Sequence, residues 1–265
     1  MKWYTEWRRA RILRRAKIDE ALWRTILSRY PFLATLSDDE AARLREKVVL
    51  FLHAKSIHGA GGLAMRDEIR LAIAAQACIL ILNLDLSYFR GWVEVIVYPD
   101  EFVATYEYVD ENGVAHSVSE PMSGESWLQG PVILSWADAG ERGGGGYNVV
   151  IHEFAHKLDM LNGDANGFPP LHADMSREDW SRAFSEGYAD FCARVDRDEP
   201  LPIDAYAAED PAEFFAVLSE AFFEIPGAVE EFYPEIYRQL ARFYRQDPAL
   251  RLTPRTRDVT GVMAT

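Results

Sequence analysis

The chain has 265 residues and a formal net charge of −14, and hydrophobic residues make up 49% of it. This composition excludes an intrinsically disordered protein, because disorder combines low hydrophobicity with high charge. The acidity also argues against a general nucleic-acid-binding protein. The only cysteines are Cys78 and Cys192, which excludes a small disulfide-stapled scaffold and indicates a reduced, cytoplasmic chain.

Basic residues are concentrated at the start of the chain. Residues 1–17 carry a net charge of +6, so the other 248 residues carry −20. We interpret residues 1–17 as a basic arm: a solvated terminal helix is the simpler expectation, and a contact with an anionic surface or partner is the alternative. No apolar stretch follows the arm, so we expect no secretory signal. No apolar run reaches the roughly 18 residues of a transmembrane helix.

The first third of the chain has a helical pattern. Apolar residues recur at steps of three and four from Asp19 to about His53. Within this stretch Ser37 and Glu40 have the spacing of a capping box, a hydroxyl at the N-cap and a carboxylate three residues later, which predicts the start of a helix. Residues 59–62 interrupt the pattern with three glycines. The apolar run from Ile69 to Leu84 then predicts a buried helix.

Sequence typical of strands follows. Residues 93–109 alternate between apolar and polar side chains, which predicts strands with a turn between them. Short extended segments are expected at 114–118, after the turn signal Asn112-Gly113, and at 131–136. The four consecutive glycines at 143–146 predict a loop, and no phosphate-binding motif surrounds them.

Helical sequence resumes near Tyr147. The order of helices, then strands, then helices predicts an α+β fold with a small mixed sheet rather than alternating βαβ units. We expect one compact domain over residues 18–253, with a helical N-terminal part over 18–85, and a tail over 254–265. The later helices are predicted at about 177–194, 211–224 and 235–245.

The helix near Tyr147 contains the motif HExxH, from His152 to His156. The two histidines are one turn apart on the same helical face, so both imidazoles reach one ion. Glu153 projects beside that face, as a general base for a water activated by the metal. This ligand chemistry predicts a single Zn²⁺ ion, although histidine and carboxylate ligands also accept other divalent ions.

A catalytic zinc needs a third protein ligand, and the sequence offers several. Asp159 shares the face of the two histidines and is either a ligand or a hydrogen-bond acceptor for an imidazole. Glu186 and Asp190 have the ExxxD spacing of thermolysin-like enzymes. Glu213, in the first turn of a strongly apolar helix, is either a ligand or a plain capping residue. Metzincins are excluded, because Asp159 and Asn162 occupy the positions of their glycine and histidine.

Further motifs accompany HExxH in a recognisable order. They are Asn162-Gly-Asp164, Ile203-Asp-Ala-Tyr-Ala-Ala208 and Asp210-Pro-Ala-Glu-Phe-Phe-Ala-Val-Leu-Ser-Glu220, with Tyr98-Pro99, Ser126-Trp127, Gln129-Gly130-Pro131 and Gln246-Asp247-Pro248. With them the chain resembles, from about residue 20 to 252, the Mlc titration factor A family of bacterial zinc metallopeptidases. Around the HExxH helix and the Glu-Phe-Phe-Ala helix, that family resembles the catalytic domain of anthrax lethal factor.

The resemblance implies a zincin-like fold of the gluzincin type and an aminopeptidase-like activity on short peptides. It implies His152, His156 and Glu213 as zinc ligands, Glu153 as general base and Tyr206 as the hydrogen-bond donor to the oxyanion. With these three ligands, Asp159 is expected to contact a ligating imidazole and not the metal, and Glu186 is an ordinary helix residue.

The family is named for sequestering Mlc, a repressor of glucose-uptake genes, so the resemblance also implies this repressor as a partner. The alternative function is a regulatory binding protein whose peptidase activity is secondary. In either case, we expect control of transcription by capture of a protein, without direct contact with nucleic acid.

Overall fold

The computed structural model describes residues 2–109, 115–122, 124–126 and 130–252. The predicted turn at Asn112-Gly113, the motif residues Trp127 and Gln129, and the predicted tail from residue 254 lie outside the described residues. None of the helices within these ranges is long and apolar enough to cross a membrane.

Helices dominate the first 80 residues, as predicted. The basic arm forms a helix, and Ser37 is the N-cap of α4 in a complete capping box with Glu40. The helix predicted at Ile69–Leu84 is α5, which ends at Leu80 and is buried along most of its length. The elements are α1 (Lys2–Arg15), α2 (Glu20–Arg29), α3 (Pro31–Ala34), α4 (Asp38–Ala54) and α5 (Asp67–Leu80).

A four-stranded mixed sheet lies next to these helices, which confirms the α+β class with a small mixed sheet. Its strands are β1 (Ser56–Gly59), β2 (Glu94–Tyr98), β6 (Val132–Ser135) and β5 (Gly124–Ser126), in that spatial order. Strands β1, β2 and β6 are parallel, and the edge strand β5 is antiparallel to β6. The sheet therefore presents β5 at one edge.

One expectation about the order of elements is wrong. Strand β1 precedes α5, so that β1, α5 and β2 form a parallel βαβ unit inside a fold that otherwise runs helices, strands, helices. The strand has four residues, and Ile57 is its one buried side chain. A strand this short and this exposed has no alternation from which to predict it.

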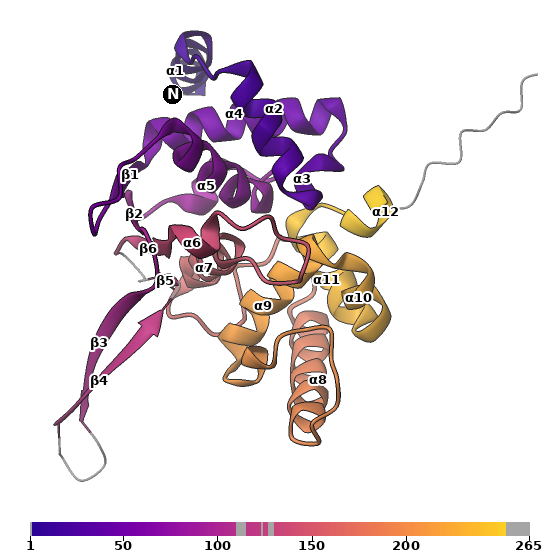
Figure 1. Ribbon diagram of the computed structural model, residues 1–265. Helices are drawn as coiled ribbons and strands as arrows, with labels where there is room; N and C mark the ends of the chain where they lie inside the picture. The colour runs from indigo at the N-terminus through magenta and orange to yellow at the C-terminus, as the bar shows by residue number, and fades with distance from the viewer. Residues whose placement is uncertain (1, 110–114, 123, 127–129, 253–265) are drawn as a thin grey trace, which may run out of the picture.

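A two-stranded hairpin interrupts the chain between the sheet strands. It consists of β3 (Phe102–Val109) and β4 (Ala115–Met122), which pair antiparallel. Figure 1 shows this hairpin extending away from the body of the molecule.

The rest of the chain is helical. The three predicted later helices are present, but the short helices α6, α10 and α12 were not predicted. In Figure 1 the N-terminal helices lie at the top and the C-terminal helices at the lower right, with α7 and α9 between them. The elements are η1 (Leu86–Phe89), α6 (Trp136–Ala139), α7 (Val149–Asp159), η2 (Met160–Asn162), α8 (Arg177–Val195), η3 (Ala205–Ala208), α9 (Pro211–Glu224), α10 (Pro226–Phe232), α11 (Pro234–Tyr244) and α12 (Pro248–Leu252).

One continuous cluster of buried apolar side chains joins the two groups of helices, from Trp23 on α2 to Tyr244 on α11. Helices α7 and α9 pass through its centre and pack against each other, and α7 also contacts α5 and strand β5. Both helices are buried on nearly all sides. The two elements that carry the chemical motifs are therefore held rigidly by the core.

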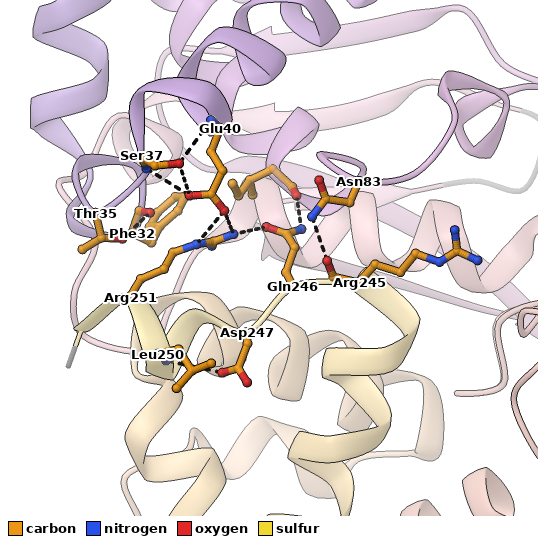
Figure 2. A network of polar contacts seen from close by, with 11 residues as sticks. Phe32, Thr35, Ser37, Glu40, Asn83, Arg245, Gln246, Asp247, Leu250 and Arg251 are labelled. Atoms are coloured by element: carbon orange, nitrogen blue, oxygen red, sulfur yellow. Dashed lines mark hydrogen bonds and ion pairs between the residues drawn. The ribbon is translucent and has the colours of Figure 1, made fainter. Parts of the chain in front are cut away.

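The C-terminal end of the described chain is fastened back onto the N-terminal helices. Arg251 on α12 donates to Glu40 at the start of α4, at 2.8 Å, and to Gln246 at 3.0 Å. Gln246 in turn donates to the Ile79 carbonyl at 2.7 Å. Figure 2 shows this network, with Arg251 between Glu40 and Gln246 and with Asn83 bound to the backbone of Arg245.

Candidate metal centre

Helix α7 carries the HExxH motif and begins at a well-defined cap. The side chain of Asn148 accepts a hydrogen bond from the Ile151 amide at 2.9 Å, which satisfies one of the free donors of the first turn. From there the helix buries Phe154, Leu158 and their apolar neighbours. His152 and His156 lie on the face that meets α9, with ring centroids 4.8 Å apart.

Helix α9 brings Glu213 to the same place. Asp210 caps the helix by accepting from the amides of Ala212 and Glu213 at 2.7 and 2.9 Å. Pro211 occupies the first turn, where its lack of an amide N–H leaves no donor in need of an acceptor. The Glu213 carboxylate then faces the two imidazoles of α7. Its Oε2 lies 3.0 Å from His152 Nε2, and its Oε1 lies 3.3 Å from His156 Nε2.

These atoms have the spacing of ligands to one ion. His152, His156 and Glu213 form a group of possible metal-binding residues. The two Nε2 atoms are 3.1 Å apart, whereas tetrahedral ligands at about 2.0–2.1 Å from Zn²⁺ lie about 3.4 Å from one another. The histidine and carboxylate donors therefore fit a single zinc ion with only small adjustments.

Glu153 lies beside this group and is buried, with 5% of its surface exposed. Burial raises the pKa of Glu153 to about 7, against the opposing effect of the two nearby imidazoles, while the carboxylates of Glu213 and Glu220 raise it further. Three carboxylates and two imidazoles share this small volume. A divalent cation is the charge that stabilises such a group, because it favours the ionised carboxylates.

Tyr206 approaches the site from the element before α9. It lies on η3, where Asp204 accepts from its amide at 2.9 Å. Its ring centroid is 6.1 Å from that of His152, and 49% of the residue is exposed. Burial of the phenol raises the pKa of Tyr206 to about 12, helped by Glu213 and Glu153, so the hydroxyl remains protonated at neutral pH.

Asp159 is fully buried at the end of α7, where it organises the following loop. Its Oδ2 accepts from the amides of Asn166 and Gly167, both at 2.7 Å. Within the described residues, its other oxygen Oδ1 has no hydrogen-bond partner, and neither does the buried Nδ1 of His156. The hydrogen bonds of Asp159 are therefore made to the loop after α7.

Glu186 and Asp190 do not join the site. Both residues are exposed on α8, and Asp190 pairs with Arg194 at 2.9 Å. Their ExxxD spacing therefore belongs to a solvated helix face, and the third position beside the histidines is taken by Glu213.

Sequence reasoning missed two residues that contact the site. Glu220 is two turns after Glu213 on α9, and its Oε1 is 2.7 Å from His152 Nδ1. The spacing of seven residues, which puts both glutamates on one face, was the available signal. The second is Gly124 on β5, whose Cα packs so closely on Glu153 that an added Cβ would lie 2.4 Å from Glu153 Oε1. No local sequence pattern predicts the contact between Gly124 and Glu153.

The glycine loop at 143–146 also has a structural explanation. Gly143 has a φ of +69°, and a Cβ there would lie 2.5 Å from Glu224 Oε1. The backbone amide of the next residue, Gly144, donates a hydrogen bond to the Glu224 carboxylate. The loop wraps closely around a buried carboxylate, and this approach requires glycine at position 143.

A comparison with protein families identifies the class. The chain belongs to the family of glucose-regulated metallo-peptidases M90, whose model matches residues 4–245. The HExxH helix and the facing glutamate thus lie in a metallopeptidase, in the part of the chain that the family model covers.

Three relatives of the chain carry the name Mlc titration factor A. The chain is 39% identical to that of Cronobacter sakazakii over 234 residues, 87% of this chain and 88% of the relative. It is 40% identical to that of Salmonella arizonae over 87% of this chain and 93% of the relative. The protein of Yersinia enterocolitica is 37% identical, over 88% of each chain.

Proposed function

We propose that this protein is a zinc-dependent peptidase with a zincin-like active site of the gluzincin type. The observation that carries the proposal is the convergence of His152, His156 and Glu213, with buried Glu153 beside them. Membership of a metallopeptidase family supports a metal and a peptide substrate. The choice of zinc rests on the ligands, because two imidazoles and one carboxylate are typical of catalytic zinc.

The side chains of the site have separate roles in hydrolysis. Zinc held by His152, His156 and Glu213 would supply a Lewis acid and lower the pKa of water in the site. Glu153 accepts a proton from the attacking water and returns it to the leaving amine, a task that suits a carboxylate with a pKa near neutrality. Tyr206 donates its phenolic proton in a hydrogen bond to the carbonyl oxygen as negative charge develops there.

Asp159 is assigned a supporting role and does not bind the metal. Its carboxylate holds the loop at 166–167 after the HExxH helix, and its buried Oδ1 is available to an imidazole donor. We assign it to the positioning of His156.

An aminopeptidase-like preference for short substrates is the most specific form of the proposal. The test uses protein stripped of metal by a chelator and then restored with Zn²⁺, assayed on alanine p-nitroanilide and on its N-acetylated form. We expect turnover to return with zinc for the free amine and to be lost for the acetylated substrate. Equal turnover of both would contradict the exopeptidase preference, and no turnover of these or of longer peptides would contradict the peptidase assignment.

We further propose a regulatory role in the cytoplasm through binding of the repressor Mlc, which the name of the relatives supports. The experiment measures binding of purified Mlc to the wild-type protein and to Glu153→Gln by calorimetry. Equal affinities are expected, because Glu153 is buried and glutamine has nearly the same shape, so the surface offered to a partner is unchanged. Tight binding by a zinc-loaded protein that hydrolyses no peptide would favour the alternative, a regulatory binding protein with secondary peptidase activity. No binding would contradict this partner.

A further inference from the structure

Glu220 is a buried carboxylate that the hydrolytic roles above do not use. Its side chain is 2% exposed. One oxygen, Oε1, lies 2.7 Å from His152 Nδ1, on the side of the imidazole that faces away from Glu213. The other oxygen, Oε2, accepts the backbone amide of Asn148. Both oxygens thus have a partner on or beside the start of α7.

We propose that Glu220, held by Asn148, is the residue that positions His152 for metal binding. The inference rests on the proposed metal site and adds to it a determinant of metal affinity outside the three ligands. A ligating histidine commonly donates its second ring N–H to a carboxylate, which fixes the orientation of the ring and increases its basicity.

The contact selects one form of the imidazole ring. An ionised carboxylate only accepts hydrogen bonds, so His152 Nδ1 must carry a proton to bond to Glu220. In the neutral ring the lone pair then lies on Nε2. This is the nitrogen that faces Glu213 Oε2 at 3.0 Å and His156 Nε2 at 3.1 Å. Glu220 therefore turns the ligating nitrogen toward the predicted ion.

Asn148 fixes the position of Glu220 by binding in three directions. Its backbone amide donates to Glu220, and its side-chain oxygen caps α7 at the Ile151 amide. Its side-chain nitrogen donates to Glu224 Oε1 and to Gln76 Oε1, both at 2.9 Å. Asn148 thus ties the first turn of the HExxH helix to α9 and to α5, which leaves Glu220 little freedom to move.

No other residue on this face of α9 provides the acceptor. The position one turn after Glu213 is Val217, a buried apolar side chain. Glu224, one turn after Glu220, bonds to Asn148 and to the Gly144 amide. Burying a carboxylate is costly unless it is fully paired, and the pairing of Glu220 with His152 is direct.

The experiment compares Glu220→Gln with Glu186→Gln, the same substitution at an exposed position of α8 that does not join the site. Zinc affinity is measured by competition with a chromophoric chelator, and Co²⁺ absorption reports the ligand geometry. We expect Glu220→Gln to weaken zinc binding by roughly 10- to 100-fold and to alter the Co²⁺ spectrum. Glu186→Gln should keep the wild-type affinity within about threefold, since Glu186 lies outside the site.

Wild-type zinc affinity in a folded Glu220→Gln variant would overturn the inference. A wild-type protein that binds no metal would instead contradict the proposed function. Because Glu220→Gln removes a buried charge and can unfold the protein, a second measurement uses the unaltered chain. ¹⁵N spectra of the histidine rings in metal-free protein should show His152 protonated on Nδ1. A ring protonated on Nε2 alone would contradict the proposed role of Glu220.

Discussion

Gly124 brings the edge strand of the sheet against the proposed general base. A Cβ at this position would lie 2.4 Å from Glu153 Oε1 and 2.7 Å from Val149 Cγ2. Neither atom is the free end of a flexible surface side chain, because both residues are buried on α7. The absence of a side chain at position 124 is therefore a requirement of the site itself.

Gly124→Ala should accordingly disturb both stability and catalysis. Overpacking of this kind costs about 1–3 kcal/mol, and displacement of Glu153 should lower kcat more than it raises KM. Urea unfolding and steady-state kinetics measure the two effects. The matched control is Gly145→Ala, where an added Cβ meets no atom within 4 Å. Wild-type stability and kcat in Gly124→Ala would show that the close contact has no consequence.

At the scale of elements, the α12–α4 connection is held by a partly buried ion pair. The side chains of Arg251 and Glu40 are 11% and 20% exposed, and they lie 2.8 Å apart. Glu40 also accepts the Ser37 amide in the capping box. The Glu40 carboxylate thus caps the start of α4 and also binds Arg251 on α12, the last described helix of the chain (Figure 2).

A double-mutant cycle on Arg251→Met and Glu40→Gln measures this connection. We expect a coupling free energy of unfolding of about 1–3 kcal/mol, because the pair is partly desolvated and hydrogen-bonded. The control cycle uses Arg182 and Asp179, an exposed pair on α8 at 2.7 Å, which should couple more weakly because solvent screens its charges. Equal coupling in the two cycles would contradict a special role for the α12 contact.

The same pair predicts a pH dependence. Burial raises the pKa of Glu40, but hydrogen bonds from Ser37 and the charge of Arg251 outweigh it, and the net pKa lies below the usual 4.5. A carboxyl whose pKa is lower in the folded state stabilises the protein above its unfolded pKa, and this contribution is lost as the pH falls through the folded pKa. Wild-type stability should therefore fall more steeply than that of Glu40→Gln below about pH 4.5. Parallel curves from unfolding at pH 3 to 6 would contradict the lowered pKa.

Local sequence signals predicted the helices whose N-termini have a side-chain cap. The caps at Ser37 and Asp210 are read directly from residue types at fixed spacing, and both are present. The HExxH spacing likewise requires only one helix. Strand β1 escaped prediction because it has a single buried residue, and its place in the sheet depends on pairing with β2, almost 40 residues later.

The sequence did not predict the contacts between elements that are distant along the chain. The Glu220 contact to His152 exists because α9 packs on α7 across 68 residues. Gly124 meets Glu153 because β5 lies at the sheet edge beside α7. Neither packing arrangement follows from periodicity, which reports the buried face of an element but not its neighbour.

At the scale of the whole molecule, metal should contribute to folding stability. Two of the proposed ligands are on α7 and the third is on α9, so the ion would join helices that lie at the centre of the core. A ligand that binds only the folded state at 100 times its Kd stabilises it by about 2.7 kcal/mol. We therefore expect Zn²⁺ to raise the Tm of metal-free protein by about 5–10 °C, as measured by calorimetry. The His156→Gln variant should show a much smaller rise, and an equal rise would place the ion elsewhere.

The proposed hydrolysis depends on Glu153 as the general base beside a bound metal. The most direct test is one measurement on matched samples: hydrolysis of alanine p-nitroanilide by zinc-loaded wild-type protein and by Glu153→Gln, with metal content determined on the same preparations. We predict one zinc per chain in both, and kcat reduced by roughly 10²- to 10⁴-fold in the variant. Unchanged turnover by a fully zinc-loaded Glu153→Gln protein would contradict the role of Glu153 as general base.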